Sequence, residues 1–400
     1  MPMTLNSRKV VSGTRAGGSS IARIEFTSVI EETSELPGSG PGKVFLAPGF
    51  VDLQVNGFAG VDYNDPTIRP EAFARSIQYL FQTGVTKFLP TVITSSRERI
   101  TGALRALAEA KQAFQRCSMP EANAIAGFHV EGPHISPDDG PRGAHPIQYV
   151  RPPDFDEFQR WQEAARGEVR MVTVSPEYAA APRYISALAR AGVVVSIGHT
   201  GANAEQIRAA VDAGATMSTH LGNGAHAVLP KTKNYIWDQL TEDRLTASFI
   251  VDGIHIPQPF LTGALRIKGT SRSVLVTDAV SPAMCKPGPY QLGDIPVELL
   301  PDNRVVLRGG VRLAGSGLTM DAAVGNCVRL GRVSIQAALR MATVNPARAA
   351  RLAGRKRGLL AGDTADLVRF RWDEASHSLA VLETIVAGAT VHSREDPPNH

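Results

Sequence analysis

The sequence has few cysteines, no long apolar run and no basic cluster, and each absence excludes a class of protein. The three cysteines, Cys117, Cys285 and Cys327, are odd in number and lack CxxC spacing, so neither a disulfide framework nor a cysteine zinc site is expected. No apolar run approaches the roughly 20 residues that cross a membrane. Residues 1–20 are basic but lack the apolar centre of a secretory signal. These absences predict a cytoplasmic protein with reduced thiols and no membrane partner.

The charge balance is mildly basic. The 400 residues carry a formal net charge of +4, which is compatible with an anionic small-molecule substrate. Lysine and arginine form no concentrated patch with interleaved aromatic residues, so nucleic-acid binding is not expected. With 43% hydrophobic and 20% charged residues, the composition is that of an ordinary folded chain with a sizeable core.

Apolar segments alternate with helical patterns along most of the chain, which is typical of a parallel α/β fold. The length suits a (β/α)8 TIM-like barrel with an accessory domain, and the regular spacing of the segments favours that barrel over a doubly wound open sheet. We predict barrel strands at residues 50–55, 86–89, 124–130, 170–174, 193–197, 216–219, 247–251 and 274–277.

Both ends of the chain have the pattern of short strands separated by Gly, Ser and Pro. Neither end contains a catalytic constellation, and the two could pair with each other. We therefore predict a small β-sandwich domain formed by both termini, residues 1–49 and 358–400, beside a barrel at residues 50–357. Residues 287–313 are typical of an inserted hairpin, and the last barrel helix is expected to begin near Leu318.

One predicted β-α-β unit, residues 193–226, contains two histidines that each follow a strand. Parallel strands joined by a crossover helix present their carboxyl ends on the same side, so His199 and His220 are expected to be neighbours. Two imidazoles at one edge suggest a metal. The pair alone is equally consistent with two structural histidines.

Polar residues also accumulate where other predicted strands end, and a barrel places its chemistry at this carboxyl face. Period-2 alternation directs Asp52, Gln54 and Asn56 toward the barrel interior. It does the same for His129 and Glu131 on the third strand. His129 is expected to be mainly an interior hydrogen-bonding residue.

A carboxylate with two imidazoles is a sound catalytic zinc set that leaves positions open for water and substrate. Glu131, His199 and His220 supply this set. Asp278 follows the last strand and is the candidate general base toward a water. The alternatives are a buried ion pair for Glu131 and a helix cap for Asp278. The convergence of five strand ends on the same chemistry favours the catalytic interpretation.

These residues belong to motifs that resemble the N-acetylglucosamine-6-phosphate deacetylase family of the amidohydrolase superfamily. In order, the matching segments are LAPGFVDLQVNG at 46–57, GVTKFLPTVIT at 84–94, HVEGP at 129–133, RGAH at 142–145, GHT at 198–200, THLGN at 219–223, VDGIH at 251–255, VTDA at 276–279, LAGSGLTM at 313–320, MATVNPAR at 341–348 and GDTADL at 362–367. They run through most of the barrel.

The resemblance implies a barrel with a small β domain, usually in a homodimer, that hydrolyses the acetamide of an amino sugar. It also implies the metal-binding and acid/base roles given above. It adds four residues that contact the substrate, the last two of them at a phosphate group: His145, His255, Asn223 and the backbone of Gly224.

Many members of the superfamily bind a second metal through a His-X-His motif on the first strand. Gln54 and Asn56 occupy those positions here, and their amides are poor zinc ligands. We therefore expect one divalent metal per chain, zinc first with Fe²⁺ or another divalent ion as alternatives, and Gln54 at the substrate side. The fourth strand offers no lysine for a carbamate bridge, which argues against dihydroorotase-like or urease-like chemistry.

The segment that would hold the phosphate departs from the family. The family commonly has an arginine there that reaches across the dimer, and an ungapped placement puts Lys231 at its position. A lysine holds phosphate as a point charge without the bidentate fork. Lys233 and His226 could compensate. Otherwise both lysines are solvated loop charges.

The predicted reaction is hydrolysis of N-acetylglucosamine 6-phosphate to glucosamine 6-phosphate and acetate. One alternative keeps the hydrolysis but changes the substrate to a galactosamine phosphate, an unphosphorylated N-acyl amino sugar or an N-acyl-D-amino acid. A second alternative is a metal-free barrel that serves as an assembly protein.

Overall fold

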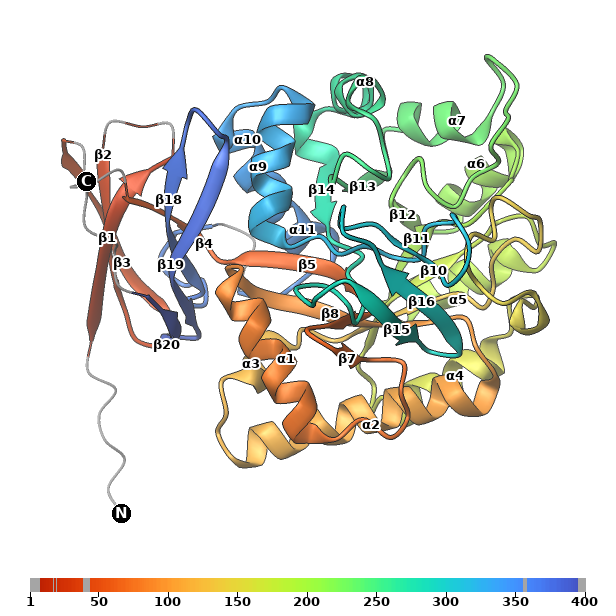
Figure 1. Cartoon of the computed structure of the whole chain (residues 1–400), viewed down its shortest axis with the longest axis horizontal. Helices are drawn as coiled ribbons and strands as arrows, with labels where there is room; N and C mark the ends of the chain where they lie inside the picture. The colour runs from red at the N-terminus through yellow and green to blue at the C-terminus, as the bar shows by residue number, and fades with distance from the viewer. Residues whose placement is uncertain (1–7, 17, 19, 39–43, 355–357, 395–400) are drawn as a thin grey trace.

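The computed structural model describes residues 8–16, 18, 20–38, 44–354 and 358–394. It has two parts, a barrel surrounded by helices and a sheet built from both ends of the chain, drawn in red and blue at the left of Figure 1. Among the described residues, none of the helices has both the length and the apolar character needed to cross a membrane.

Eight parallel strands form the barrel, so the predicted fold class is confirmed. The ends of the sheet meet through backbone hydrogen bonds: Asp278 donates to the Gln54 carbonyl at 3.0 Å, and Asn56 donates to the Ala279 carbonyl at 2.7 Å. The strands are β5 (Phe50–Val55), β8 (Val85–Ile93), β9 (Phe128–Glu131), β10 (Val169–Val174), β11 (Val194–Ile197), β12 (Ala215–Ser218), β13 (Thr246–Ile250) and β14 (Ser273–Val276).

The third strand begins later than its apolar pattern predicted. Ala124 ends a short helix, α3 (Glu121–Ala124), and Gly127 has a φ of 135°, a conformation that favours glycine. The chain therefore turns before it enters β9 at Phe128. An apolar run of this length does not by itself separate strand from short helix.

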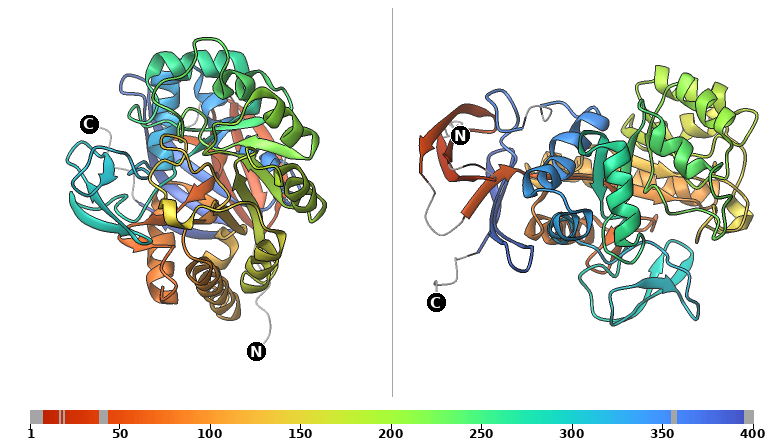
Figure 2. Two further views of the ribbon diagram at one scale, coloured as in Figure 1. Left: turned by 90° about the vertical axis from the view of Figure 1, so that its right-hand side faces the viewer. Right: turned by 90° about the horizontal axis from the view of Figure 1, so that it is seen from above.

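Helices surround the barrel and bury their apolar faces against it (Figure 2). In α6, for example, Asn203 caps the first turn, and Ile207, Ala210 and Val211 are the buried positions. The helices are α1 (Pro70–Gln82), α2 (Arg97–Arg116), α4 (Phe155–Ala164), α5 (Ala181–Arg190), α6 (Ala204–Asp212), α7 (Tyr235–Thr241), α8 (Gln258–Lys268), α9 (Met320–Gly331), α10 (Ile335–Ala342) and α11 (Val344–Ala349).

The two ends of the chain form one seven-stranded sheet in the order β20-β19-β18-β4-β1-β2-β3. Its centre is β4, which pairs in parallel with β1 and antiparallel with β18. The strands are β1 (Lys9–Arg15), β2 (Ser20–Phe26), β3 (Ile30–Pro37), β4 (Val44–Pro48), β18 (Leu367–Asp373), β19 (Ser378–Val386) and β20 (Ala389–Ser393).

This sheet has its own apolar core, to which Ile24, Leu46 and Leu367 contribute. The prediction that both termini build one small β domain is confirmed. The boundaries placed at residues 49 and 357 stay predictions, and residue 357 lies outside the described residues.

The predicted insertion forms a hairpin with a third strand. It consists of β15 (Gly288–Leu292), β16 (Ile295–Leu299) and β17 (Val305–Leu307), and it stands out from one side of the barrel in Figure 2, coloured cyan. A smaller ribbon, β6 (Gly57–Phe58) with β7 (Val61–Asp62), follows the first barrel strand.

Candidate active site

A cavity of about 650 Å³ opens among the loops that follow the barrel strands. Its walls contain most of the residues predicted for the site: Glu131, His145, His199, His220, Asn223, Gly224, His255 and Asp278. The residues predicted as metal ligands, as the general base and as several of the substrate contacts therefore line one cavity.

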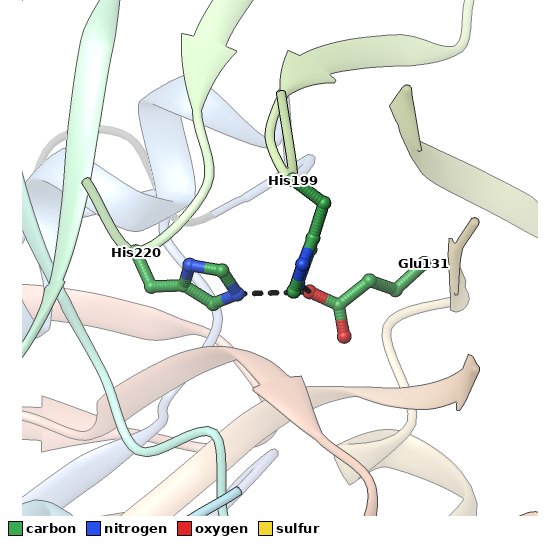
Figure 3. A group of neighbouring side chains, drawn as sticks. All are labelled: Glu131, His199 and His220. Carbon is green, nitrogen blue, oxygen red and sulfur yellow. Dashed lines mark hydrogen bonds and ion pairs between the residues drawn. The ribbon is translucent and has the colours of Figure 1, made fainter. Parts of the chain in front are cut away.

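The three predicted metal ligands converge. Glu131 is the last residue of β9, while His199 and His220 each follow a strand by two residues. The Nε2 atoms of His199 and His220 lie 3.2 Å and 3.0 Å from Oε1 of Glu131 (Figure 3). One ligand atom from each residue lies within 4.8 Å of the others, and all three side chains are buried. This donor set fits a divalent cation.

Hydrogen bonding orients one imidazole for this role. His199 Nδ1 lies 2.8 Å from the carbonyl oxygen of Pro141, to which it can only donate. The neutral ring then carries no proton on Nε2, the atom that faces Glu131, and a metal binds such a nitrogen. The equivalent orienting bond is missing at His220, whose Nδ1 has no partner among the described residues.

Glu131 and the two imidazoles shift each other's pKa values. Burial by itself would raise the pKa of Glu131, but hydrogen bonds from His199 and His220 outweigh it and hold the pKa of that carboxyl well below its usual range. Burial would lower the pKa of His220, yet the bond to Glu131 raises it. The protein thus keeps a carboxylate here and attracts positive charge to it.

Asp278 lies beside the metal ligands and is 8% exposed. Its Oδ1 accepts hydrogen bonds from Asn56 Nδ2 at 2.7 Å and from Gln54 Nε2 at 3.0 Å. Burial raises the pKa of Asp278 to about 6, and the negative charge of Glu131 adds to the rise. A general base works best when its pKa is near the operating pH.

The backbone is left-handed at three of these residues. The φ angles of His199, His220 and Asp278 are 49°, 26° and 51°. Non-glycine residues rarely adopt this region, and such conformations cluster at functional sites because the surrounding structure must enforce them. At His220, for instance, the backbone N–H donates to Ser248 Oγ at 2.8 Å.

Three other histidines behave differently from the ligands. Burial lowers the pKa of His145 to about 3, so its ring is neutral where it meets the His199 ring at a centroid distance of 4.4 Å. His255 Nδ1 lies 2.6 Å from Asp252 Oδ2. His129 bonds to the Leu53 carbonyl and to Thr173 inside the barrel, as its predicted structural role requires.

Two predicted substrate residues lie away from the cavity surface. Gln54 is 1% exposed, and its amide also donates to Glu131 Oε1 at 2.8 Å. Lys231 is exposed and does not line the cavity of its own chain. The substrate contacts of both residues stay predictions.

Sequence reasoning missed Asp139 and Arg312, which both line the cavity. Arg312 donates to both carboxylate oxygens of Asp139, at 2.8 Å and 3.1 Å. Neither residue follows a barrel strand directly, so the strand-end pattern could not identify them. The motif LAGSGLTM begins immediately after Arg312 and was the nearest signal in the sequence.

Comparison with known proteins extends over nearly the whole chain. The model of the amidohydrolase family matches residues 45–391. The chain is 31% identical to N-acetylglucosamine-6-phosphate deacetylase of Lysinibacillus sphaericus, over 92% of this chain and 90% of that relative. It is 32% identical to N-acetylgalactosamine-6-phosphate deacetylase of Shewanella sp. (strain ANA-3), over 94% and 90%.

Solved structures agree in fold. The structure of a mutant N-acetyl-D-glucosamine-6-phosphate deacetylase from Mycobacterium smegmatis, in complex with N-acetyl-D-glucosamine-6-phosphate, superposes with a TM-score of 0.84 at 29% identity. The match covers 96% of this chain and 99% of that one. The Thermotoga maritima N-acetylglucosamine-6-phosphate deacetylase gives 0.83 at 26% identity, with 96% and 100% covered.

Proposed function

Because the chain belongs to the amidohydrolase family, we propose that it hydrolyses the N-acetyl group of an amino sugar phosphate, releasing acetate and the free amine. The observation that carries this proposal is the meeting of Glu131, His199 and His220 with Asp278 in one cavity. The deacetylases named above, each similar over most of this chain, support the choice of substrate class.

The cation is proposed to be one zinc per chain, held by Glu131, His199 and His220. When bound, a divalent metal polarises the amide carbonyl and lowers the pKa of a water. Gln54 and Asn56 donate through their amide nitrogens to neighbouring carboxylates, and amides are poor zinc ligands, which supports a single metal per chain. Fe²⁺ or another divalent ion is the alternative to zinc.

The chain's own residues supply the proton transfers. Asp278, with a pKa raised to about 6, accepts the proton of the attacking water. It then returns this proton to the substrate nitrogen, so that the product leaves as an amine. His145 and His255 contact sugar hydroxyls, and Asn223 with the backbone N–H of Gly224 contacts the phosphate.

The sugar is proposed to be N-acetylglucosamine 6-phosphate. The relative named N-acetylgalactosamine-6-phosphate deacetylase, at 32% identity, makes N-acetylgalactosamine 6-phosphate the second candidate. Both sugars should be assayed for released amine, each with and without the 6-phosphate, alongside an N-acyl-D-amino acid. Turnover of a phosphorylated hexosamine supports the proposal, and turnover of the amino acid alone contradicts it.

We also propose a cytoplasmic homodimer. The three cysteines form no disulfide with one another, as expected of a reducing compartment. A dimer would give Lys231 a role. This lysine is exposed and does not line the cavity of its own chain, but it could reach the cavity of a second copy. Light scattering and sedimentation measure the mass in solution.

The alternative of a metal-free assembly protein makes the opposite prediction. An assembly protein has no need for three buried ligand atoms within 4.8 Å of one another. Elemental analysis of the purified chain decides between the two, because the deacetylase must bind a divalent metal.

A further inference from the structure

The cavity contains only one lysine or arginine among its described lining residues, and that residue is Arg312. Lys231 and Lys233 are exposed and lie outside the lining. An anionic group on the substrate therefore meets one permanent positive charge from this chain. The other basic residues in the described lining are histidines.

Some of the N–H groups of Arg312, which follows β17 in the chain, already make hydrogen bonds. Nη1 and Nη2 donate to the Asp139 carboxylate, and Nη1 also donates to the Gly143 carbonyl at 3.0 Å. Nε makes no hydrogen bond to any described residue. The edge formed by Nε and the second N–H of Nη2 is thus available, and this edge can bind a phosphate with two parallel hydrogen bonds. The side chain is 41% exposed at the cavity wall.

His226 stands close to the same loop. Gly140, next to Asp139, lies so near it that a Cβ atom there would be 2.9 Å from His226 Cα. The Tyr235 hydroxyl accepts the His226 backbone N–H at 2.7 Å and lies 3.0 Å from Nδ1. In the tautomer in which that hydroxyl donates to Nδ1, Nε2 of His226 carries a proton and can donate a hydrogen bond.

We propose that Arg312 and His226 of a single chain bind the phosphate of the substrate, which makes them the residues that select a phosphorylated sugar. This inference rests on the proposed function and specifies how its substrate is chosen. Arg312 supplies the charge and the bidentate edge, and the imidazole of His226 supplies a further hydrogen-bond donor. A cation from a second chain is then not required for phosphate recognition.

A purely positioning role for Arg312 is the competing explanation. Its bond to Gly143 holds the loop whose Pro141 carbonyl orients His199, so losing Arg312 could disturb the metal site. Asp139→Asn separates the two roles. It weakens the anchor of this loop but leaves the cation in place and removes the carboxylate that competes with phosphate.

The experiment measures kcat and KM for the 6-phosphorylated and the unphosphorylated N-acetyl hexosamine, and the inhibition constant of inorganic phosphate. Arg312→Gln is expected to raise KM for the phosphorylated sugar and the phosphate inhibition constant by about ten- to a hundredfold, with a much smaller effect on the unphosphorylated sugar. Arg312→Lys should recover part of this loss. His226→Phe should show a smaller loss of the same kind, and Asp139→Asn an unchanged or lower KM.

Three results overturn the inference. Equal losses on both sugars in Arg312→Gln, reproduced by Asp139→Asn, would identify a positioning residue. A phosphate-specific loss in Lys231→Ala with none in Arg312→Gln would assign the contact to a second chain. Unchanged constants in both variants would leave Arg312 outside the phosphate site. If the unaltered enzyme turns over no phosphorylated hexosamine, the proposed function itself fails, independently of these variants.

Discussion

The side-chain amide of Asn56 donates to Asp278 Oδ1 across 2.7 Å, and its own oxygen has no hydrogen-bond partner among the described residues. With Gln54 donating to the same Oδ1, two amides hold one carboxylate as an acceptor. The two positions at which many superfamily members have His-X-His thus hold amides here that donate to the candidate base. The role of Asp278 and the role of the amides that donate to it can therefore be tested with separate variants.

Replacing the base should abolish turnover without unfolding the site. In Asp278→Asn the amide oxygen can still accept from Asn56 and Gln54, but the side chain no longer accepts a proton from water. We expect kcat to fall by about 10²- to 10⁴-fold, with metal content unchanged. Steady-state kinetics and elemental analysis of the same preparation check both statements, and a near-normal kcat would show that Asp278 is not the base.

Removing one of the hydrogen bonds to Asp278 should reduce activity less than replacing Asp278 itself. Asn56→Ala deletes one hydrogen bond to a buried charged group, which is worth roughly 1.5–3 kcal/mol, so kcat/KM should fall by about ten- to a hundredfold. The metal content should stay the same because the Asn56 side chain donates to Asp278 and to the Ala279 carbonyl, and not to any of the three ligands. A variant with full activity would mean that Gln54 alone orients Asp278.

Metal content should be about one divalent ion per chain. Chelation should remove activity and zinc should restore it, while Glu131→Gln should bind metal far more weakly because its side chain no longer offers a carboxylate. Plasma emission spectrometry gives the stoichiometry. Two tightly bound ions per chain would contradict the assignment of Gln54 and Asn56 as non-ligands.

Mixed chains test whether Lys231 acts across a dimer. If it does, a dimer of one Lys231→Ala chain and one Asp278→Asn chain has one site with both defects and one with neither. Activity of the mixture on the phosphorylated sugar should then exceed that of either variant assayed alone. If Lys231 acts in its own chain, every site of the mixed dimer keeps one defect. If Lys231 does not act at all, Lys231→Ala alone is fully active and mixing cannot raise its activity.

A buried lysine far from the chemistry should stabilise the fold. Lys268 is fully buried, and its Nζ donates to the carbonyl oxygens of Gln239, Glu242 and Leu245 at 2.7, 2.8 and 3.2 Å. Lys268→Met leaves these acceptors without that donor, and we expect a loss of about 1–3 kcal/mol in the free energy of unfolding. Thermal or urea unfolding measures it, with exposed Lys286→Met as the matched control. Equal free energies of unfolding for the two variants would show that buried Lys268 stabilises the fold no more than exposed Lys286 does.

The strand-end residues could be predicted because parallel barrel strands are buried on both faces and therefore appear as apolar runs. Their ends mark where polar side chains enter the cavity, which is how Glu131, His199, His220 and Asp278 were identified. β3 was not predicted, because its side chains are mostly exposed at a sheet edge and show no apolar alternation. Arg312 was not identified either, because only the folded hairpin brings it to Asp139.

The strands of the terminal sheet cannot all pair at the same time during synthesis. β4 lies between β1 and β18, and β18 follows the whole barrel in the chain. While a ribosome is still making the barrel, β4 has one edge without its antiparallel partner, and such unpaired edges promote aggregation. The sheet is completed only after residues 367–393 emerge. A chain that stops before them would expose the β4 edge permanently, so we expect truncation of the last strands to lower the yield of folded protein, although none of the cavity-lining residues lies in them.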